Sequence, residues 1–411
     1  MSCGLIKAMR LCCGFSICLL MPLAVIAADA GMLSEEAFAQ CVAGLQGKAR
    51  EQGISTETIN TSLAGVSFVP RVIELDRRQP EFTETFANYF NRRVTDQRVE
   101  QGRALLDTHR ELLDEVAEKY GVPAQYLVSF WGLETNYGSY FGRMPVLDSL
   151  ATLACDGRRS TYFTAELMSA LKILDEGAIT VDRMKGSWAG AMGHVQFMPD
   201  VFLRYAVDGD GDGRRDLWNS LPDAMYSAGN FLRGLGWESG SRWGREVHLP
   251  DGFDYHKAGR ANKKSLVEWR QMGVRNADGG PLPEADIQAA LLVPAGHQGP
   301  KFLVYDNFDV IMRWNRSEFY ALAVGHLADR IAGAGRLRQP PPDNAVRLSR
   351  DQVIELQQTL NKKGFDAGSA DGIPGPATRA AISRFQRANN MVADGFASRE
   401  VLTRLGISIS H

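Results

Sequence analysis

The stretch from 124 to 138 reads AQYLVSFWGLETNYG, and it decides how the rest of the chain is interpreted. Leu127, Phe130, Trp131 and Glu134 are spaced at i, i+3, i+4 and i+7, which places them on one face of a helix. Three of these side chains are large and apolar, and the fourth is a carboxyl group. A carboxyl on such a face is poorly solvated, so its pKa should be raised, as a general acid requires near neutral pH.

The helix should end between Asn136 and Gly138, because glycine readily stops a helix. Glu134 would then lie in the last turn, where the negative end of the helix dipole also disfavours a carboxylate. The alternative is a structural Glu134 that reaches solvent or pairs with an arginine such as Arg143. This stretch by itself leaves both interpretations open.

The whole chain has 411 residues, which suggests two or three domains, and its apolar and charged fractions are ordinary for a soluble globular protein. Its formal net charge is −2. No basic run interleaved with aromatic residues is present in the sequence. Composition therefore gives no indication of nucleic-acid binding.

The N-terminus has the pattern of a secretory signal peptide over residues 1–30. Lys7 and Arg10 precede the apolar run 11–26, and Ala28-Asp29-Ala30 supplies the small residues of a cleavage site. A membrane anchor is the alternative, but 16 apolar residues are short for a span. Neither Cys18 nor Cys41 follows a Leu-small-small run. We therefore expect a soluble rather than lipid-anchored protein in the periplasm.

Cysteine usage agrees with export. Four of the six cysteines lie within residues 1–30, which leaves Cys41 and Cys155. In an oxidising compartment these two are expected to form a disulfide. Two buried free thiols are the alternative.

The rest of the chain reads as mostly helical with a small inserted sheet. Residues 31–120 are predicted to be helical, with a long run at 99–120 and an extended surface segment around 79–82 and 89–90. Further helices are expected at 156–174, 224–235 and 308–331. Short β-like runs at 247–249, 289–293 and 302–305 are separated by Pro, Gly and Asp.

Two further stretches carry polar residues that a ligand site would use. Ser187–Pro199 is rich in Gly and small residues, so its backbone can approach a neighbour closely, and it contains Ser187 and Gln196. It is either a tightly packed segment or the wall of a cleft. Asn315 and Tyr320 are either cleft lining or a helix cap and an interface residue.

An acidic loop follows at Asp208–Asp216, DGDGDGRRD. Acidic residues at positions 1, 3, 5 and 9 with glycine at 6 match the first half of a calcium loop, in which position 7, here Arg214, supplies a backbone oxygen. Position 12 is Asn219 instead of the usual Glu, and Asp223 could supply the missing carboxylate. The predicted calcium ligands are Asp208, Asp210, Asp212, Arg214 and Asp223, and an acidic turn without metal is the alternative.

The C-terminal part reads as a separate unit. Residues 334–347 form a linker whose consecutive prolines, Pro340 to Pro342, make a semi-rigid extended spacer. Residues 348–411 form a compact unit with helices expected at 350–362, 377–389 and 398–405.

Together these motifs resemble the lytic murein transglycosylase B family, periplasmic enzymes that cut the glycan strands of peptidoglycan. The resemblance covers residues 33–333, and the tail resembles the small helical peptidoglycan-binding domain through 371–378, Phe385-Gln386 and Asp394-Gly395. The matching motifs are Trp131–Gly138, Ala189–Pro199, Asp208–Gly213 with Leu217-Trp218, and Trp314–Ala321.

The resemblance implies a mainly α, lysozyme-like α+β catalytic domain over 31–333 with a small inserted sheet, followed by a three-helix binding domain. It implies that Glu134 is the single catalytic acid/base and that the polar residues already named line the sugar subsites: Ser187, Gln196, Asn315 and Tyr320. Calcium in the acidic loop would be structural, and no organic cofactor is implied. Two departures stand out. Trp314 replaces the family's usual Tyr, and the acidic loop is one residue longer before Asp223.

The resemblance also implies the reaction: cleavage of the MurNAc–GlcNAc β-1,4 bond with formation of a 1,6-anhydro-MurNAc end, in cell-wall turnover. The partners would be peptidoglycan glycan strands and other cell-wall enzymes, and the protein would be a monomer. Two rival interpretations remain at this point. A lysozyme-like hydrolase would use a second carboxylate such as Asp148, and a non-catalytic wall-binding protein would use Glu134 only structurally.

Overall fold

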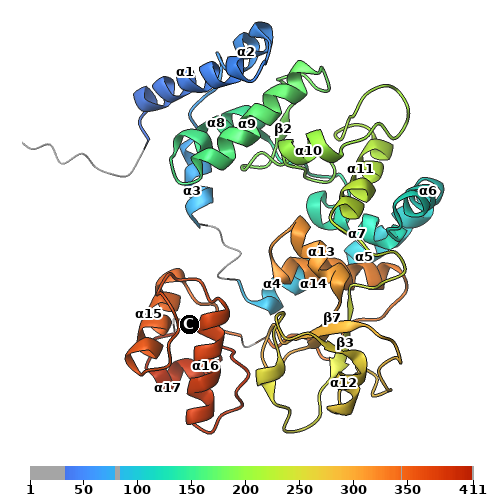
Figure 1. The fold of residues 1–411 in the computed structure, drawn as a ribbon, viewed down its shortest axis with the longest axis vertical. Coiled ribbons are helices and arrows are strands. Elements are labelled where there is room, and N and C mark those ends of the chain that lie inside the picture. Colours follow the sequence, from blue (N-terminus) through green and yellow to red (C-terminus); the bar gives the residue numbers. More distant parts are fainter. Residues whose placement is uncertain (1–32, 79–83, 344, 410–411) are drawn as a thin grey trace, which may run out of the picture.

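The computed structural model describes residues 33–78, 84–343 and 345–409, and Figure 1 shows it as a large helical body with a small sheet on one side and a three-helix unit beside that sheet. The expected signal peptide, residues 1–30, and the expected extended segment at 79–82 lie outside the described residues. Within the described ranges, no helix has both the length and the apolar character that crossing a bilayer demands.

The N-terminal third is helical, as expected. Ser34 caps the first helix by accepting the main-chain N–H of Ala37, the contact that a Ser N-cap normally makes. Its helices are α1 (Glu35–Glu51), α2 (Thr56–Ser62), α3 (Pro70–Arg78), α4 (Phe86–Arg93), α5 (Asp96–Thr108) and α6 (Arg110–Tyr120).

Two details of this region differ from the sequence prediction. The run 99–120 is not one helix, because it breaks at His109 into α5 and α6. Tyr89 and Phe90 do not lie in an extended surface segment but inside α4, where both are buried. The Phe86 ring packs on Phe90 at 5.0 Å, so this short helix owes its stability to burial of aromatic residues.

Helix α7 (Ala124–Thr135) is the central element of the body. The sequence predicts one buried face, but every residue from Tyr126 to Leu133 is buried, so the helix is covered on all sides. Helices α5, α6, α11 and α14 pack around it. A helix that is apolar all round is a core helix. The Ser129 hydroxyl, buried on it, donates to the Val324 carbonyl of α14 at 2.7 Å.

The middle of the body contains two short paired strands and four more helices. The expected helix at 156–174 begins only at Ser160, and a further helix that the sequence analysis did not identify precedes it. The elements are β1 (Met144–Pro145), α8 (Val146–Cys155), α9 (Ser160–Asp175), β2 (Lys185–Gly186), α10 (Pro199–Tyr205) and α11 (Leu221–Gly234). Strands β1 and β2 pair antiparallel and lead into the Ser187–Pro199 segment.

The predicted inserted sheet is present, and its three expected runs are its central strands. The order is β4-β6-β7-β3-β5, with all pairs antiparallel. Its elements are β3 (Gly244–His248), the 3₁₀ turn η2 (Tyr255–Lys257), β4 (Lys264–Ser265), α12 (Leu266–Gln271), β5 (Arg275–Asn276), β6 (Gln288–Leu292) and β7 (Lys301–Val304).

The two faces of this sheet belong to two different cores. Leu292 and Phe302 join the core of the helical body, whereas the alternate residues Leu291 and Leu303 join a small core around Trp269 of α12. Alternation along a strand sends successive side chains to opposite faces. The insertion therefore shares one face with the body and builds its own core on the other.

The last helical segment of the body is broken. The sequence predicts one helix over 308–331, but the structure has α13 (Asp306–Trp314) and α14 (Glu318–Ile331). Between them Asn315 is extended, and Ser317 caps α14 by accepting the main-chain N–H of Tyr320. The break carries Trp314 and Tyr320 to the active-site region.

The C-terminal unit has its own core. It consists of α15 (Arg350–Lys362), α16 (Pro376–Ala388) and α17 (Arg399–Leu405), close to the predicted positions. Its buried apolar residues include Leu356, Ile382 and Leu402.

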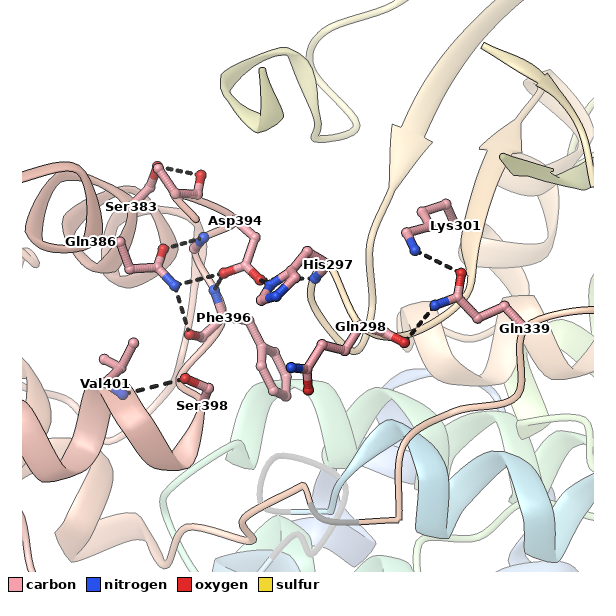
Figure 2. A network of polar contacts seen from close by, with 12 residues as sticks. His297, Gln298, Lys301, Gln339, Ser383, Gln386, Asp394, Phe396, Ser398 and Val401 are labelled. Carbon is pink, nitrogen blue, oxygen red and sulfur yellow. Dashed lines mark hydrogen bonds and ion pairs between the residues drawn. The ribbon is translucent and has the colours of Figure 1, made fainter. Parts of the chain in front are cut away.

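The segment before this unit lies along the inserted sheet. The Glu246 carboxylate of β3 accepts the main-chain N–H groups of Arg338 and Gln339 at 2.9 and 2.8 Å. The Gln339 side chain accepts from Lys301 Nζ at 2.7 Å and donates to the Gln298 carbonyl at 2.6 Å, as Figure 2 shows. The prolines of this segment are thus preceded by a stretch that is hydrogen-bonded to the sheet.

Candidate active site

The carboxyl end of α7 is built to place Glu134 in the last turn. The helix ends at Thr135, one residue earlier than the expected range, because Asn136 already has a left-handed φ of 49°. Tyr137 then folds back onto the helix, and its hydroxyl donates to the Arg98 carbonyl at 2.7 Å. Gly132 makes room for this ring: a Cβ on it would lie 2.7 Å from the Tyr137 ring carbons.

Glu134 has two hydrogen-bond donors on one of its two oxygens. Trp314 Nε1 donates to Oε1 at 2.9 Å, and the Tyr320 hydroxyl donates to the same oxygen at 2.5 Å. Within the described ranges, no hydrogen bond to Oε2 is formed. The carboxyl is therefore held by one oxygen, and the other oxygen is available for chemistry.

Burial raises the pKa of Glu134, and the donors from Tyr320 and Trp314 and the charge of Arg93 act in the opposite direction. The Phe130 ring, which packs 4.5 Å from the Trp314 ring, belongs to this apolar surround. Burial and the charge of Glu134 also raise the pKa of Tyr320 well above its usual value, so Tyr320 keeps its proton and remains a donor. A carboxyl with a raised pKa suits a general acid near neutral pH.

The wall beside α7 is the segment Ser187–Pro199. Trp131 Nε1 donates to His194 Nδ1 at 2.9 Å, and the Thr135 hydroxyl donates to the His194 carbonyl at 2.8 Å. Burial lowers the pKa of His194 to about 4, so the imidazole is neutral at physiological pH and Nδ1 can accept this bond. The last turn of α7 is thus fixed on both sides of Glu134.

Gln196 and Ser187 occupy turns of this wall. Gln196 has a left-handed φ of 48°, and its side-chain amide donates to the Phe141 and Gly193 carbonyls at 3.1 Å each. The Ser187 hydroxyl accepts the N–H groups of Ala189 and Ala191. Both side chains are partly exposed, and neither hydrogen-bonds Glu134 among the residues that the structure describes.

Of the other residues that the sequence predicted for this site, Tyr320 contacts Glu134 and the rest do not. Tyr320 contacts Glu134 directly, whereas the exposed Asn315 accepts the main-chain N–H of Ser317 with its own side chain. Asp148, the second carboxylate of the hydrolase alternative, accepts the N–H of Ser67 and makes no contact with Glu134 that the described part of the chain shows. The pairing with Arg143 is not formed either: the partners of Glu134 are Trp314 and Tyr320.

Three side chains near Glu134 were not singled out in the sequence as parts of its surroundings: Trp314, Arg93 and His194. Trp314 was noted only as a departure, yet its indole N–H donates to Glu134. Arg93 and His194 come from segments far away along the chain. The Arg93 guanidinium donates to the Leu133 carbonyl at 3.4 Å, next to Glu134. Only the tertiary fold brings these residues together.

The acidic loop brings three carboxylates together. Asp208, Asp210 and Asp212 are exposed and offer oxygens that all lie within 4.8 Å of one another. Main-chain N–H groups of the loop shape it, for example Gly211 on Asp208 at 2.6 Å. Convergent carboxylate oxygens are the ligands that calcium prefers, so these residues fit the ion.

Asp223 does not belong to this group. It is fully buried, and its two oxygens accept the main-chain N–H groups of Gly209, Asp210 and Asp216 at 2.7, 3.3 and 2.6 Å. Asp223 therefore organises the loop through hydrogen bonds. Arg214 stands next to the group, and its main-chain N–H donates to Asp212.

The acidic loop is connected to the wall of the site. The main-chain N–H of His194 donates to the Leu217 carbonyl at 2.8 Å, and Trp218 Nε1 donates to the Lys185 carbonyl at 3.1 Å. An ion that ordered this loop would thus steady the His194 backbone.

Cys41 of α1 and Cys155 of α8 form a disulfide in the structure, with their Cα atoms 6.0 Å apart and a sequence separation of 114. The bond attaches the first helix to the body.

Comparison with known proteins identifies the family. The transglycosylase SLT domain model matches residues 37–329, and the peptidoglycan binding domain model matches 349–405. The chain is 32% identical over 250 residues to the membrane-bound lytic murein transglycosylase B of Escherichia coli K12. That match covers 59% of this chain and 66% of the relative.

Solved structures agree with this. SltB3 of Pseudomonas aeruginosa, in complex with NAG-anhNAM-pentapeptide, has 47% identity and a TM-score of 0.87 over 90% of this chain and 99% of its own. The Escherichia coli lytic transglycosylase Slt35, in complex with calcium, has 29% identity and a TM-score of 0.62 over 74% of this chain and 95% of its own. With a matched domain over most of its length and a partly buried glutamate at the centre of that domain, the chain belongs to the lytic murein transglycosylase B family and carries a C-terminal peptidoglycan-binding domain.

Proposed function

We propose that Glu134 is the single acid/base with which this peptidoglycan lytic transglycosylase cleaves glycan strands. One observation carries the proposal. Two donors hold Oε1 of Glu134, and Oε2 has no partner among the described residues. A proton on Oε2 can therefore be given to a substrate oxygen without breaking the bonds that orient the carboxyl.

In the first step, Glu134 protonates the glycosidic oxygen between N-acetylmuramic acid and N-acetylglucosamine. The bond from that oxygen to the muramyl anomeric carbon breaks, and the oxygen of the muramyl N-acetyl group assists at that carbon. Glycosidases commonly need two carboxylates, but substrate assistance replaces the second one. This fits a site in which Asp148 is directed towards Ser67 instead.

In the second step, the Glu134 carboxylate takes the proton of the muramyl 6-hydroxyl. The freed oxygen attacks the anomeric carbon and closes the 1,6-anhydro ring. The Trp314 and Tyr320 donors stabilise the carboxylate between the two steps. The proton is first given and then regained by Glu134, and no water is consumed.

The sugar contacts come from residues near the same end of α7. We assign substrate binding to Ser187, Gln196 and Asn315, whose side chains are at least partly exposed. Tyr320 is buried against Glu134, so its role is to position the acid instead of binding sugar from solvent.

Product analysis tests the reaction. Purified sacculi treated with the enzyme should release muropeptides lighter by one water than the reducing-end products of a hydrolase, as mass spectrometry measures. Glu134→Gln should lower the rate by roughly 10²- to 10⁴-fold, because it removes the transferable proton but keeps an acceptor for both donors. Reducing-end products would support the hydrolase alternative. Unchanged release by folded Glu134→Gln would show that Glu134 is not the acid, and a wild type that binds sacculi but releases no muropeptide would be a wall-binding protein.

Calcium in the acidic loop is the second part of the proposal. Asp208, Asp210 and Asp212 would hold the ion, with the Arg214 backbone beside them, and Asp223 would brace the loop. The ion would offset most of the negative charge of three adjacent carboxylates and fix the loop that contacts the wall. EDTA should lower the melting temperature of the wild type, and Asp210→Asn should abolish that shift. Asp251→Asn, which removes an exposed acid elsewhere, should retain it. Equal melting curves with and without EDTA would contradict calcium binding.

The location follows from the substrate. Peptidoglycan lies outside the cytoplasm, and a disulfide between Cys41 and Cys155 suits an oxidising compartment. We propose export to the periplasm, with residues 1–30 removed, as a soluble monomer that works beside other cell-wall enzymes. N-terminal sequencing of the protein isolated from the periplasmic fraction tests this, and recovery of intact residues 1–30 in the membrane fraction would refute it.

A further inference from the structure

The C-terminal unit contains the same turn twice. In the first copy, Gln357 of α15 donates to Asp371 Oδ1 at 3.0 Å and to the Ile373 carbonyl at 3.0 Å. Its Oε1 accepts the N–H of Gly372 at 2.9 Å, and Asp371 Oδ1 accepts the N–H of Ile373 at 2.9 Å. A buried glutamine thus holds an Asp-Gly-Ile turn from inside.

The second copy repeats these bonds one helix later. Gln386 of α16 donates to Asp394 Oδ1 at 2.7 Å and to the Phe396 carbonyl at 3.3 Å. Its Oε1 accepts the N–H of Gly395 at 2.8 Å, and Asp394 Oδ1 accepts the N–H of Phe396 at 2.9 Å. In both copies, Oδ1 is used within the turn, and among the described residues no group of the turn hydrogen-bonds Oδ2.

The second copy has a ligand, and the ligand is the main chain of the catalytic body. Asp394 Oδ2 accepts the main-chain N–H of His297 at 2.8 Å, and His297 Nδ1 lies 2.6 Å from the same oxygen, as Figure 2 shows. Phe396 packs beneath the neighbouring glycine: a Cβ on Gly296 would lie 2.9 Å from Phe396 Cβ. This turn therefore recognises a peptide N–H next to a small residue.

The first copy presents the same groups to solvent. Asp371 is exposed, and its Oδ2 has no hydrogen bond within the described part of the chain. Ile373, the counterpart of Phe396, is 45% exposed, although it is a large apolar side chain. The hydrogen bond from Gln357 is the main cause that lowers the pKa of Asp371, so the carboxylate is charged at neutral pH.

We propose that the Asp371–Ile373 turn binds the stem peptide of peptidoglycan, with Asp371 Oδ2 accepting a main-chain N–H of the peptide and Ile373 packing beside a small side chain. The proposal rests on the proposed function, because the stem peptide is part of the polymer that the enzyme is proposed to cleave. The ligand of the SltB3 complex carries a pentapeptide, so such a chain of N–H donors is part of this family's substrates. The turn would therefore bind the stem peptide and not the sugar chain of peptidoglycan.

A second copy of this chain is a poorer occupant. The segment that Asp394 recognises, Gly296-His297, is already covered by the Asp394 turn of its own molecule. The Asp371 turn of another molecule could not reach it without displacing that contact.

The experiment uses the full chain with Glu134→Gln, so that substrate is bound and not turned over. Binding of a fluorescent peptidoglycan pentapeptide is measured by anisotropy for this protein and for versions that add Asp371→Asn or Ile373→Ser. Asn at 371 keeps an acceptor for the turn but puts an N–H₂ group at the Oδ2 position. The matched control is Asp351→Asn, which removes the same charge from an exposed residue of α15.

Asp371→Asn should weaken peptide binding about tenfold, which is the usual size of a lost charge-assisted hydrogen bond, and Asp351→Asn should leave it unchanged. Ile373→Ser should also weaken peptide binding, because it removes the apolar side chain that would pack beside a small side chain of the peptide. Glycan strands stripped of their peptides should bind equally well to all versions.

Two results would overturn the proposal. One is equal peptide affinity for the Asp371→Asn, Ile373→Ser and parent proteins at unchanged melting temperature. The other is an equal loss with Asp351→Asn, which would indicate unspecific attraction. Either result leaves the proposed function intact if the wild-type enzyme still releases anhydro muropeptides, because that readout depends on Glu134 and not on the Asp371 turn.

Discussion

As the proposed single acid/base, Glu134 would have to meet two requirements that oppose each other. A general acid near neutral pH needs burial, because burial raises its pKa, but the same carboxyl must exist as an anion between the two steps. The structure meets both needs with an apolar surround and two donors on Oε1. Because both donors act on one oxygen, the charged form is stabilised without any group from the described residues occupying Oε2.

The first prediction concerns the stability of Glu134→Gln. Since burial raises the folded-state pKa of Glu134 above its unfolded value, the folded state binds this proton more tightly. The stability that the wild type gains from this proton is therefore present below the unfolded pKa and is lost as pH rises through the folded pKa. Gln does not titrate, so the variant should be more stable than the wild type at pH 7, and the gap should shrink towards pH 4.

Calorimetry of both proteins at the two pH values measures this difference. Glu318→Gln, which changes a partly exposed acid at the start of α14, serves as the control for the loss of one carboxylate. A wild type that is more stable than Glu134→Gln at pH 7 would show that burial of this carboxyl has no net cost.

The second prediction concerns Trp314. Its N–H lowers the pKa of Glu134, so Trp314→Phe should raise that pKa further and move the alkaline limb of the kcat/KM profile to higher pH. Losing a hydrogen bond to a charged group should also lower kcat by about tenfold. Trp314→Tyr restores the residue that the family usually has and should recover part of the loss. An alkaline limb that stays in place in Trp314→Phe would mean that the Trp314 N–H has no influence on the pKa of the acid.

At the scale of elements, the sequence predicted what depends on local pattern. The helix around Glu134, the three central strands and the three C-terminal helices follow from periodicity and turn residues. It did not predict that α7 is covered on all sides, since the partners of α7 come from distant segments. The breaks at His109 and Asn315 also depend on tertiary packing, because neither position has a strong helix breaker.

The candidate site likewise contains residues that local sequence pattern could identify and residues that it could not. Glu134 could be singled out because a carboxyl interrupts an apolar run. The carboxylates of the acidic loop could be singled out by their spacing. The hydrogen bonds of Asp223 to main-chain N–H groups could not be predicted, because the sequence does not distinguish such a buried Asp from a metal ligand. Arg93 and the Trp131–His194 bond are tertiary contacts with no local signature.

The third prediction concerns Gly132 in α7. Alanine usually stabilises a helix by up to about 1 kcal/mol relative to glycine. At Gly132 the added methyl would meet the Tyr137 ring at 2.7 Å, and crowding of a packed core typically costs about 1 to 3 kcal/mol. Gly132→Ala should therefore be destabilising and should lower activity, because Tyr137 lies just after the last turn that carries Glu134.

Urea unfolding measures this effect, with Gly44→Ala in α1 as the matched control. A Cβ at Gly44 meets nothing within 4 Å, so that substitution should leave stability equal or slightly higher. If Gly132→Ala were as stable as Gly44→Ala, the turn after α7 would be looser than the structure indicates.

At the scale of the whole molecule, distant segments are attached to the body at a few points. The Cys41–Cys155 disulfide attaches α1 to α8, and the hydrogen bonds from Glu246 hold the segment before the C-terminal unit. Asp394 then fixes that unit to the loop before β7. The disulfide reinforces an apolar core that α1 and α8 share, whereas the C-terminal unit has a core of its own and is joined to the body by these polar contacts.

The fourth prediction concerns this disulfide. A bond that closes a loop of 114 positions restricts the unfolded chain, and removal of such a bond typically costs about 2 to 5 kcal/mol. Cys41→Ser with Cys155→Ser should lower the free energy of unfolding by that amount while kcat stays near its normal value, because neither residue contacts Glu134. Denaturant unfolding with and without reductant measures it. A double variant that matches the reduced wild type supports the assignment, and a wild type that is insensitive to reductant refutes it.

The attachment of the segment 338–339 to the sheet changes what the C-terminal unit does for catalysis. A binding unit on a free chain only raises the local concentration of substrate. A unit fixed by Glu246, Gln339 and Asp394 keeps a constant span between the place where a strand is gripped and the place where it is cut. If the Asp371 turn binds peptidoglycan as proposed, a strand held there would present to Glu134 a bond at a fixed distance from that turn.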